Sequence, residues 1–312
     1  MPQATWSDLD IEALLTLDRL GEGCWRSRHG DANLNGRSYG GQLLGQAMMA
    51  ALMDVPAGRE ATMMQFLFLQ GAMPDEPVDF GVTVLQEGKR FSSRHVRAAQ
   101  GNGRTVLDAQ VTCALPLDAP THASPSTAPL GERPEDLPRF DEVDRALIGD
   151  LTRLGGYSQD RKPSIDFRVP DPTRQLAETH MNGRFRFWMR AIRPLPDDAR
   201  FQAAAFAYLS DWWLNFAALG LHLRDLHGRP LYISSLNHAL WLHRPVRADQ
   251  WLHVDCTSPC AQAGRGLSIG AVHDQQGRQL ASMTQECLMA YVSQPVDAQA
   301  AITAERVAPR SP

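Results

Sequence analysis

Apolar residues recur at helical spacing along two stretches of the chain. Residues 201–223 contain one glycine and no proline, and apolar side chains occupy nearly every face of the helix that they would form. A helix that is apolar all round belongs in a protein core. Residues 41–55 have the same character. The pattern predicts two buried helices, with Asp211 in the middle of the longer one.

Strand-like runs accompany both predicted helices. A shorter amphipathic helix is expected first, over residues 7–20, with Ser7 near its start. The order of one long helix and several antiparallel strands then occurs twice, which predicts two copies of one domain. In the first copy the expected strands are residues 62–69, 78–87, 92–99 and 105–114. In the second copy they are residues 184–193, 231–236, 238–243, 251–258, 266–273 and 279–291.

The segment between the two copies changes character. It begins with a run rich in proline, serine and alanine, which is typical of a linker. Within it, residues 141–154 predict a short surface helix and residues 164–169 a strand. The predicted organisation is a first domain over residues 1–118, a linker over 119–182, a second domain over 183–293 and a flexible tail over 294–312.

Charge and cysteine content narrow the function classes. The chain carries 31 basic and 35 acidic residues, which argues against a nucleic-acid surface or an anionic membrane surface. No run approaches 18 apolar residues, so no transmembrane helix is expected. The five cysteines and the absence of a signal-peptide pattern predict reduced thiols in the cytoplasm. Cys256 and Cys260 have no second cysteine pair, so a metal site is not expected.

Asp211 is the most informative residue of the pattern. A buried carboxylate needs partners or a shifted pKa, and such groups often mark functional sites. The competing interpretation is a carboxylate on a solvated stripe, or one that caps a local break in the helix. Helical periodicity alone favours neither.

Motifs in both halves resemble one known family when they are taken as a set. They are SYGGQLLGQAMMAA (from Ser38), FWMRA (from Phe187) with PDD (from Pro196), YLSD (ending at Asp211), SLNHALWLHRP (from Ser235) and RGLSIGAVHDQQGRQLASMTQE (from Arg265). This set resembles the acyl-CoA thioesterase II (TesB-like) family over about residues 30–118 and 183–291. The resemblance implies an α+β double hotdog fold, in which two fused domains each wrap an antiparallel sheet around a long central helix.

The same resemblance places the reaction on Asp211, Ser235 and Gln285. Ser235 stands where the family usually has threonine, and it keeps the hydroxyl. Asp211 would accept a proton from a water that Ser235 and Gln285 hold in line with a thioester carbonyl. The first half has no evident equivalent of this set. The implied substrate is a fatty acyl-CoA, the implied assembly is a homo-oligomer, and no metal or redox cofactor is implied.

Three further residues are candidates for substrate binding. Gly41 lies at a predicted helix start, where backbone N–H groups can face an oxyanion. His238 is either structural or lines the pocket. Arg265 is either a ligand for a CoA phosphate or a solvated loop arginine.

Other functions compete with hydrolysis by an activated water. Ser38 lies in a G-x-S-x-G pattern, which in serine hydrolases follows a buried strand, but the residues before it are polar and turn-forming. A hotdog hydratase would show an Asp-x4-His arrangement, which this chain lacks. A non-catalytic acyl-CoA-binding protein would keep the pocket and lose the residues that hold water, so the presence of Asp211 argues against it.

Overall fold

The first half of the chain contains one long helix and six strands. The computed structural model describes residues 6–128, 131–154, 157–177, 182–226 and 229–291. The elements of the first half are α1 (Ile11–Leu15), β1 (Leu17–Gly21), β2 (Cys24–Ser27), α2 (Gly40–Leu52), β3 (Glu60–Phe68), β4 (Asp79–Glu87), β5 (Phe91–Gln100) and β6 (Arg104–Ala114). The four strands predicted after α2 are thus confirmed.

The predicted helix over residues 7–20 is wrong in its extent. Asp10 caps α1 by accepting a hydrogen bond from the Ala13 backbone at 2.9 Å, and α1 ends after only five residues. The chain then enters β1, which pairs with β2 as a ribbon at the sheet edge. Because most of β1 is exposed, it has no alternating apolar pattern by which its sequence could be recognised.

The second half repeats the order of the first. Its elements are β8 (Arg184–Ala191), α4 (Ala199–Ser210), α5 (Phe216–Leu219), η5 (Gly220–Leu226), β9 (Leu231–Leu242), β10 (Leu252–Gln262), β11 (Arg265–Asp274) and β12 (Gln279–Tyr291). The two strands predicted over residues 231–236 and 238–243 are one continuous strand, β9.

The predicted helix over residues 201–223 is broken at Asp211. The side chain of Asp198 caps the start of α4 by accepting a hydrogen bond from the Phe201 backbone at 2.9 Å. Asp211 is the C-cap of α4, and Trp213 follows with a φ of 60°. A side chain at positive φ is strained and cannot continue a right-handed helix. Asp211 therefore lies at a helix end instead of within a helix.

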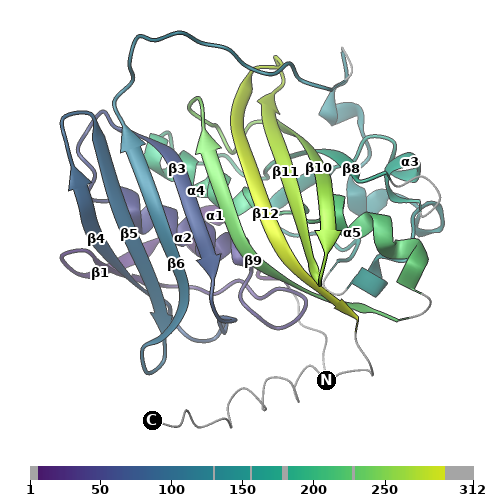
Figure 1. Ribbon diagram of the computed structural model, residues 1–312, viewed down its shortest axis with the longest axis horizontal. Coiled ribbons are helices and arrows are strands. Elements are labelled where there is room, and N and C mark those ends of the chain that lie inside the picture. The colour runs from purple at the N-terminus through teal and green to yellow at the C-terminus, as the bar shows by residue number, and fades with distance from the viewer. Residues whose placement is uncertain (1–5, 129–130, 155–156, 178–181, 227–228, 292–312) are drawn as a thin grey trace.

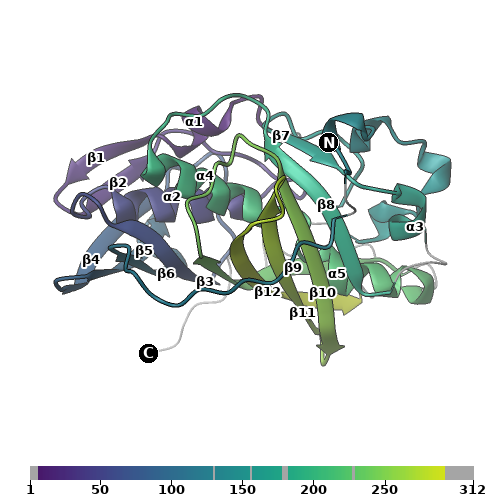
Figure 2. The same ribbon diagram turned by 90° about the horizontal axis from the view of Figure 1, so that it is seen from above.

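All the described strands join in one antiparallel sheet. Their order is β1-β2-β4-β5-β6-β3-β9-β12-β11-β10-β8-β7, and the two halves meet where β3 pairs with β9, from Met63 opposite Trp241 to Leu67 opposite Asn237. The sheets of the two halves thus join edge to edge. Figure 1 and Figure 2 show α2 and α4 side by side on one face of this sheet.

The two long helices pack closely on each other and on the sheet. Nearly all of α2 and α4 is buried. Gly45 of α2 allows the close approach, because a β-carbon there would lie 2.9 Å from the carbonyl oxygen of Ala204. Within the described parts of the chain, no helix is long and apolar enough to cross a membrane.

The segment between the halves contains short elements that pack on the second half. They are η1 (Pro134–Asp136), η2 (Phe140–Glu142), η3 (Arg145–Leu147), η4 (Leu151–Leu154), β7 (Ile165–Arg168) and α3 (Pro172–Leu176). β7 confirms the strand predicted over 164–169 and pairs with β8. In place of the surface helix predicted over 141–154 there are separate 3-10 turns. The domain boundaries at residues 118 and 182 stay a prediction, and the tail over 294–312 lies outside the described residues.

Candidate functional site

The carboxylate of Asp211 lies between the two halves of the chain. It is carried at the end of α4 and faces the first turn of α2, where Gly40 and Gly41 begin the helix. A β-carbon on Gly40 would lie 2.7 Å from Oδ2 of Asp211 and 3.1 Å from the ring of Phe68. The missing side chain at Gly40 therefore provides the space that the carboxylate occupies.

Gln285 connects Asp211 to Ser235. Its Nε2 donates to Oδ1 of Asp211 at 2.5 Å and to Oγ of Ser235 at 2.9 Å. Because a carboxylate can only accept hydrogen bonds, the nitrogen of the Gln285 amide must face Asp211. Gln285 is fully buried, whereas Asp211 and Ser235 are partly exposed.

A β-bulge directs Ser235 toward Gln285. On β9, Asn237 pairs with Glu286 and Ser235 pairs with Cys287, so Leu236 is the extra residue. In a regular strand Ser235 would face away from His238, since alternate residues point to opposite faces. The bulge shifts this alternation by one residue and brings Ser235 to the face of Gln285.

Among the described residues, the hydroxyl of Ser235 only accepts hydrogen bonds, so its hydrogen is available to a ligand. Its oxygen accepts from Gln285 Nε2 and, at 3.4 Å, from Nδ2 of Asn215. A serine hydroxyl has one hydrogen to donate in addition to its acceptor positions. With both of these contacts using the oxygen as an acceptor, Ser235 can donate to a water or to a substrate oxygen.

Burial changes the ionisation of Asp211. Loss of solvation raises the pKa of Asp211 to about 7, while hydrogen bonds from Gln285 and the Gly41 backbone and the positive charge of Lys162 act in the opposite direction. The N-terminus of α2 also favours a negative charge nearby. A carboxylate with a pKa near neutrality is suited to accept a proton during catalysis.

His238 is neutral and contacts the last turn of α4. It is buried on β9, and desolvation lowers the pKa of His238 to about 3. Its Nε2 lies 3.0 Å from Oγ of Ser210, whose own hydrogen goes to the carbonyl of Ala207. The Nε2 of His238 is therefore the donor, and the imidazole fixes the last turn of α4 next to Asp211.

The first half contributes backbone atoms to the site. A β-carbon on Gly41 would lie 2.2 Å from the carbonyl oxygen of Tyr208 and 2.4 Å from the ring of Tyr39. Only glycine fits at this contact between α2 and α4. The Gly41 backbone N–H bonds the Asp211 carboxylate, so the first half takes part in the site although its described residues carry no second acid–hydroxyl–amide set.

Family models match both halves of the chain. One, described as an acyl-CoA thioesterase C-terminal domain, matches residues 134–289, and another, described as an acyl-CoA thioesterase N-terminal domain, matches residues 28–114. The chain belongs to the acyl-CoA thioesterase family. The TesB-like resemblance in the motifs is thus confirmed.

Relatives of this thioesterase family align with nearly the whole chain. Mouse acyl-coenzyme A thioesterase 8 is 27% identical over 290 residues, which cover 88% of this chain and 87% of the relative. Acyl-CoA thioesterase 2 of Haemophilus influenzae is 24% identical over 278 residues, which cover 89% of this chain and 96% of the relative.

Solved structures of other proteins share the fold. Acyl-CoA thioesterase II TesB2 from Mycobacterium marinum superposes with a TM-score of 0.72 at 28% identity, covering 91% of this chain and 99% of that one. A hot dog fold protein of unknown function from Alicyclobacillus acidocaldarius superposes with a TM-score of 0.70 at 17% identity, covering 91% and 98%. The predicted double hotdog fold is thus confirmed.

Two further candidates, Arg265 and Ser38, make no side-chain hydrogen bond to Asp211, Ser235 or Gln285 among the described residues. Arg265 begins β11, is exposed, and pairs with Glu286 at 3.1 Å. Ser38 precedes α2, but it follows a turn and itself forms an isolated bridge with Ala32, so the buried strand that a nucleophile elbow requires does not precede it. Its hydroxyl makes no hydrogen bond to a histidine within the part of the chain that is described.

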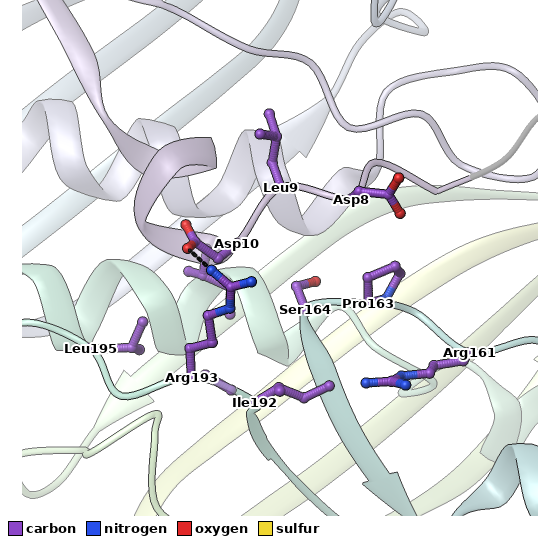
Figure 3. A pocket seen from close by; sticks show the side chains of 11 residues that line it. Asp8, Leu9, Asp10, Arg161, Pro163, Ser164, Ile192, Arg193 and Leu195 are labelled. Atoms are coloured by element: carbon purple, nitrogen blue, oxygen red, sulfur yellow. Dashed lines mark hydrogen bonds and ion pairs between the residues drawn. The ribbon is translucent and has the colours of Figure 1, made fainter.

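A cavity of about 350 Å³ lies beside the start of α1, away from Asp211, Ser235 and Gln285. Figure 3 shows its wall, where Arg193 pairs with Asp10 at 3.1 Å and Arg161 and Ser164 come from the segment before β7. Across the described ranges, no three His, Cys, Asp or Glu side chains gather as metal ligands.

Several residues of the site have no sequence signal. Asn215 reaches Ser235 because α4 breaks, and Ser210 meets His238 across the core. Lys162 comes from the segment predicted to be a linker and is buried near Asp211. Each of these contacts joins residues far apart in the chain, so local patterns do not reveal them.

Proposed function

We propose that the chain hydrolyses fatty acyl-CoA to a free fatty acid and CoA, with Asp211 as the general base toward water. The observation that carries this is the carboxylate of Asp211 at the end of α4, joined by Gln285 to a serine hydroxyl with a hydrogen to donate. Burial raises the pKa of Asp211 to about 7, which suits this role. Asp211 takes a proton from the water as its oxygen attacks the thioester carbonyl. Ser235 donates a hydrogen bond to that water and fixes its position. Orienting the reactants in this way lowers the activation free energy of the reaction.

Gln285 acts in this scheme from the buried side of the site. Both hydrogens of its amide nitrogen are used, one on Asp211 and one on Ser235, so it holds the base and the hydroxyl at a constant separation. The backbone N–H of Gly40, at the start of α2, is the proposed donor to the carbonyl oxygen as negative charge develops there, because the N–H of Gly41 bonds the Asp211 carboxylate. The leaving group is the CoA thiolate, which is protonated by solvent.

Three further points belong to this proposal. Arg265 is proposed to meet a CoA phosphate, for which it would have to exchange its partner Glu286. His238 is proposed to line the back of the site. The protein is proposed to be cytoplasmic. It is also proposed to be a homo-oligomer, because of the family resemblance and because apolar side chains such as Leu67 and Ile269 are exposed on the sheet. Light scattering that gives only the monomer mass would contradict this assembly.

A thiol-release assay against acyl-CoAs of graded length tests the function. The Asp211→Asn variant keeps the shape of the side chain and removes the base, so kcat should fall by about 10²–10⁴-fold. The Ser38→Ala variant should keep nearly full activity. Loss of activity in Ser38→Ala with full activity in Asp211→Asn would replace the activated-water mechanism by a serine hydrolase. No turnover by the wild-type protein, with acyl-CoA binding intact, would point to a binding protein.

A further inference from the structure

A buried ion pair joins the middle segment of the chain to the first half. Nζ of Lys162 lies 2.6 Å from Oδ2 of Asp31, and the two side chains are 1% and 0% exposed. Lys162 precedes β7, and Asp31 lies in the loop before α2. A buried ion pair is usually no more stabilising than well-packed apolar residues of the same volume. A gain in the stability of the fold therefore does not explain why this ion pair is present.

Three aromatic rings surround the ammonium group of Lys162. Its Nζ lies 4.0 Å from the ring centroid of Trp6, 4.6 Å from that of Tyr39 and 5.6 Å from that of Tyr208. Ring faces attract a cation, and the attraction increases when water is excluded. The ring cage and Asp31 together compensate for the lost hydration of the charge and hold it at one position.

Asp31 in turn connects the start of α2 to the last turn of α4. Its Oδ2 accepts from the hydroxyl of Tyr208 at 2.9 Å, and its backbone oxygen accepts from the N–H of Tyr39 at 2.7 Å. The hydroxyl of Tyr39 donates to the carbonyl of Tyr208 at 3.2 Å. Tyr39 is the N-cap of α2 and Tyr208 lies three residues before Asp211. The network thus surrounds the two helix ends between which Asp211 is held.

Lys162 is also the cation that acts on Asp211. Its positive charge lowers the pKa of Asp211, opposing the larger effect of burial. The other titratable groups around this network are the Asp31 carboxylate, which pairs with Lys162, the neutral His238 behind Ser210, and the hydroxyls of Tyr39, Tyr157 and Tyr208, whose pKa values burial raises well above the usual range. The hydroxyls and the imidazole are uncharged at neutral pH. Burial lowers the pKa of Lys162, and the Asp31 carboxylate opposes this shift, which leaves Lys162 as the cation that favours the ionised form of Asp211.

We infer that Lys162 is a positioning residue for the Asp211 base, which it acts on from the middle segment through the buried network with Asp31, Tyr39 and Tyr208. This inference rests on the proposed role of Asp211 in hydrolysis. Its ammonium group holds the ends of α2 and α4 in register and favours the charged form of the carboxylate. The middle segment is therefore part of the working site, although it supplies no group that touches the substrate.

The pH dependence of kcat separates this role from a merely structural one. In Lys162→Met the midpoint of the acid limb should move upward by about one pH unit, because an opposite charge near a carboxylate typically lowers its pKa by about one to three units. A structural role would lower kcat equally at every pH and leave the midpoint unchanged. Arg161→Met is the matched control: it removes the same charge from the neighbouring, exposed position and should leave both kcat and the midpoint as in the wild type.

The Lys162→Met variant leaves Asp31 buried without its partner, so a second variant secures the test. Asp31→Asn with Lys162→Met removes both charges and keeps the volumes similar, which favours folding. It should show a smaller upward shift in the same direction. A wild-type midpoint in this folded double variant overturns the inference. If the midpoint is that of the wild type and Asp211→Asn is inactive in the same assay, only the role of Lys162 fails and the proposed mechanism still holds. If Asp211→Asn is fully active, the proposed function itself fails.

Discussion

Gly40 of the first half and Asp211 of the second half lie so close that a β-carbon on Gly40 would be 2.7 Å from Oδ2 of Asp211. Real β-carbons essentially never come so near to another heavy atom, so any side chain at position 40 must displace the carboxylate or the helix. The candidate site is therefore shared between the halves, and its geometry needs residues from both of them.

Replacement of Gly40 by alanine should lower kcat while the protein stays folded. The added methyl group pushes Asp211 away from the position at which Gln285 holds it, and a misplacement of about 1 Å can cost about 10²-fold in rate. Steady-state kinetics and a thermal melt of Gly40→Ala measure both quantities. Gly21→Ala is the control, because nothing lies within 4 Å of a β-carbon there. Equal kcat values for the two variants would contradict the shared site.

The activity should depend on pH through the ionisation of Asp211. Its pKa is raised to about 7, and only the carboxylate form can accept a proton. As pH falls through about 7 the carboxylate of the free enzyme is protonated, so kcat/KM should fall about tenfold per pH unit on the acid side and reach a plateau above about pH 8. A profile of kcat/KM from about pH 5 to about pH 9 measures this. Constant activity across the acid half of that range would exclude a base with this pKa.

Ser235→Ala and Gln285→Ala should each lower kcat, and their effects should overlap. Gln285 bonds both Ser235 and Asp211 through one nitrogen, so removing it already disturbs the hydroxyl. Residues that share one hydrogen-bond network are coupled by about 0.5–3 kcal/mol. A double-mutant cycle on kcat measures this coupling. Fully additive losses would mean that the two side chains act separately.

Ser235→Thr is the conservative counterpart of Ser235→Ala. It keeps the hydroxyl and restores the residue that the family usually has, so it should retain activity within about tenfold of the wild type. For Gln285→Ala the control is Gln276→Ala, which removes an amide side chain from an exposed turn.

The buried His253 should make the fold sensitive to acid. Desolvation is the main cause that lowers the pKa of His253 to about 4, and neither ring nitrogen has a hydrogen-bond partner among the described residues. In the unfolded chain this group binds a proton below about pH 6.5. The folded state therefore loses stability as pH falls from about 6.5 toward 4, by about 1–2 kcal/mol at pH 5.

The variant His253→Leu should lose less stability than the wild type between about pH 7.5 and about pH 5. Urea unfolding at both pH values measures the difference in the free energy of unfolding. His122→Gln, at an exposed position, is the control and should behave like the wild type. If His253→Leu shows the same pH dependence as the wild type, the neutral buried imidazole is not responsible for it.

Local patterns in the sequence determine the architecture of this protein. A helix that is apolar all round can only be buried, and strands that alternate or bear β-branched residues can only be stable when they pair. These constraints act over a few residues, so the long helix α2, most of the strands and the repeat of one domain follow from the chain alone. Only the motifs, through their resemblance to a family, direct attention to Asp211, Ser235 and Gln285 as a set.

Tertiary structure alone decides how these three side chains meet. The spacing of Ser235 and His238 places them on opposite faces of a regular strand, and the bulge at Leu236 reverses this. Likewise the break after Asp211 depends on the positive φ of Trp213, which tertiary packing imposes against the local helical preference. No local pattern in the sequence marks Lys162 as part of the site, because its partner Asp31 lies 131 residues away. Contacts of that range depend on the packing of the whole chain, and no local periodicity records them.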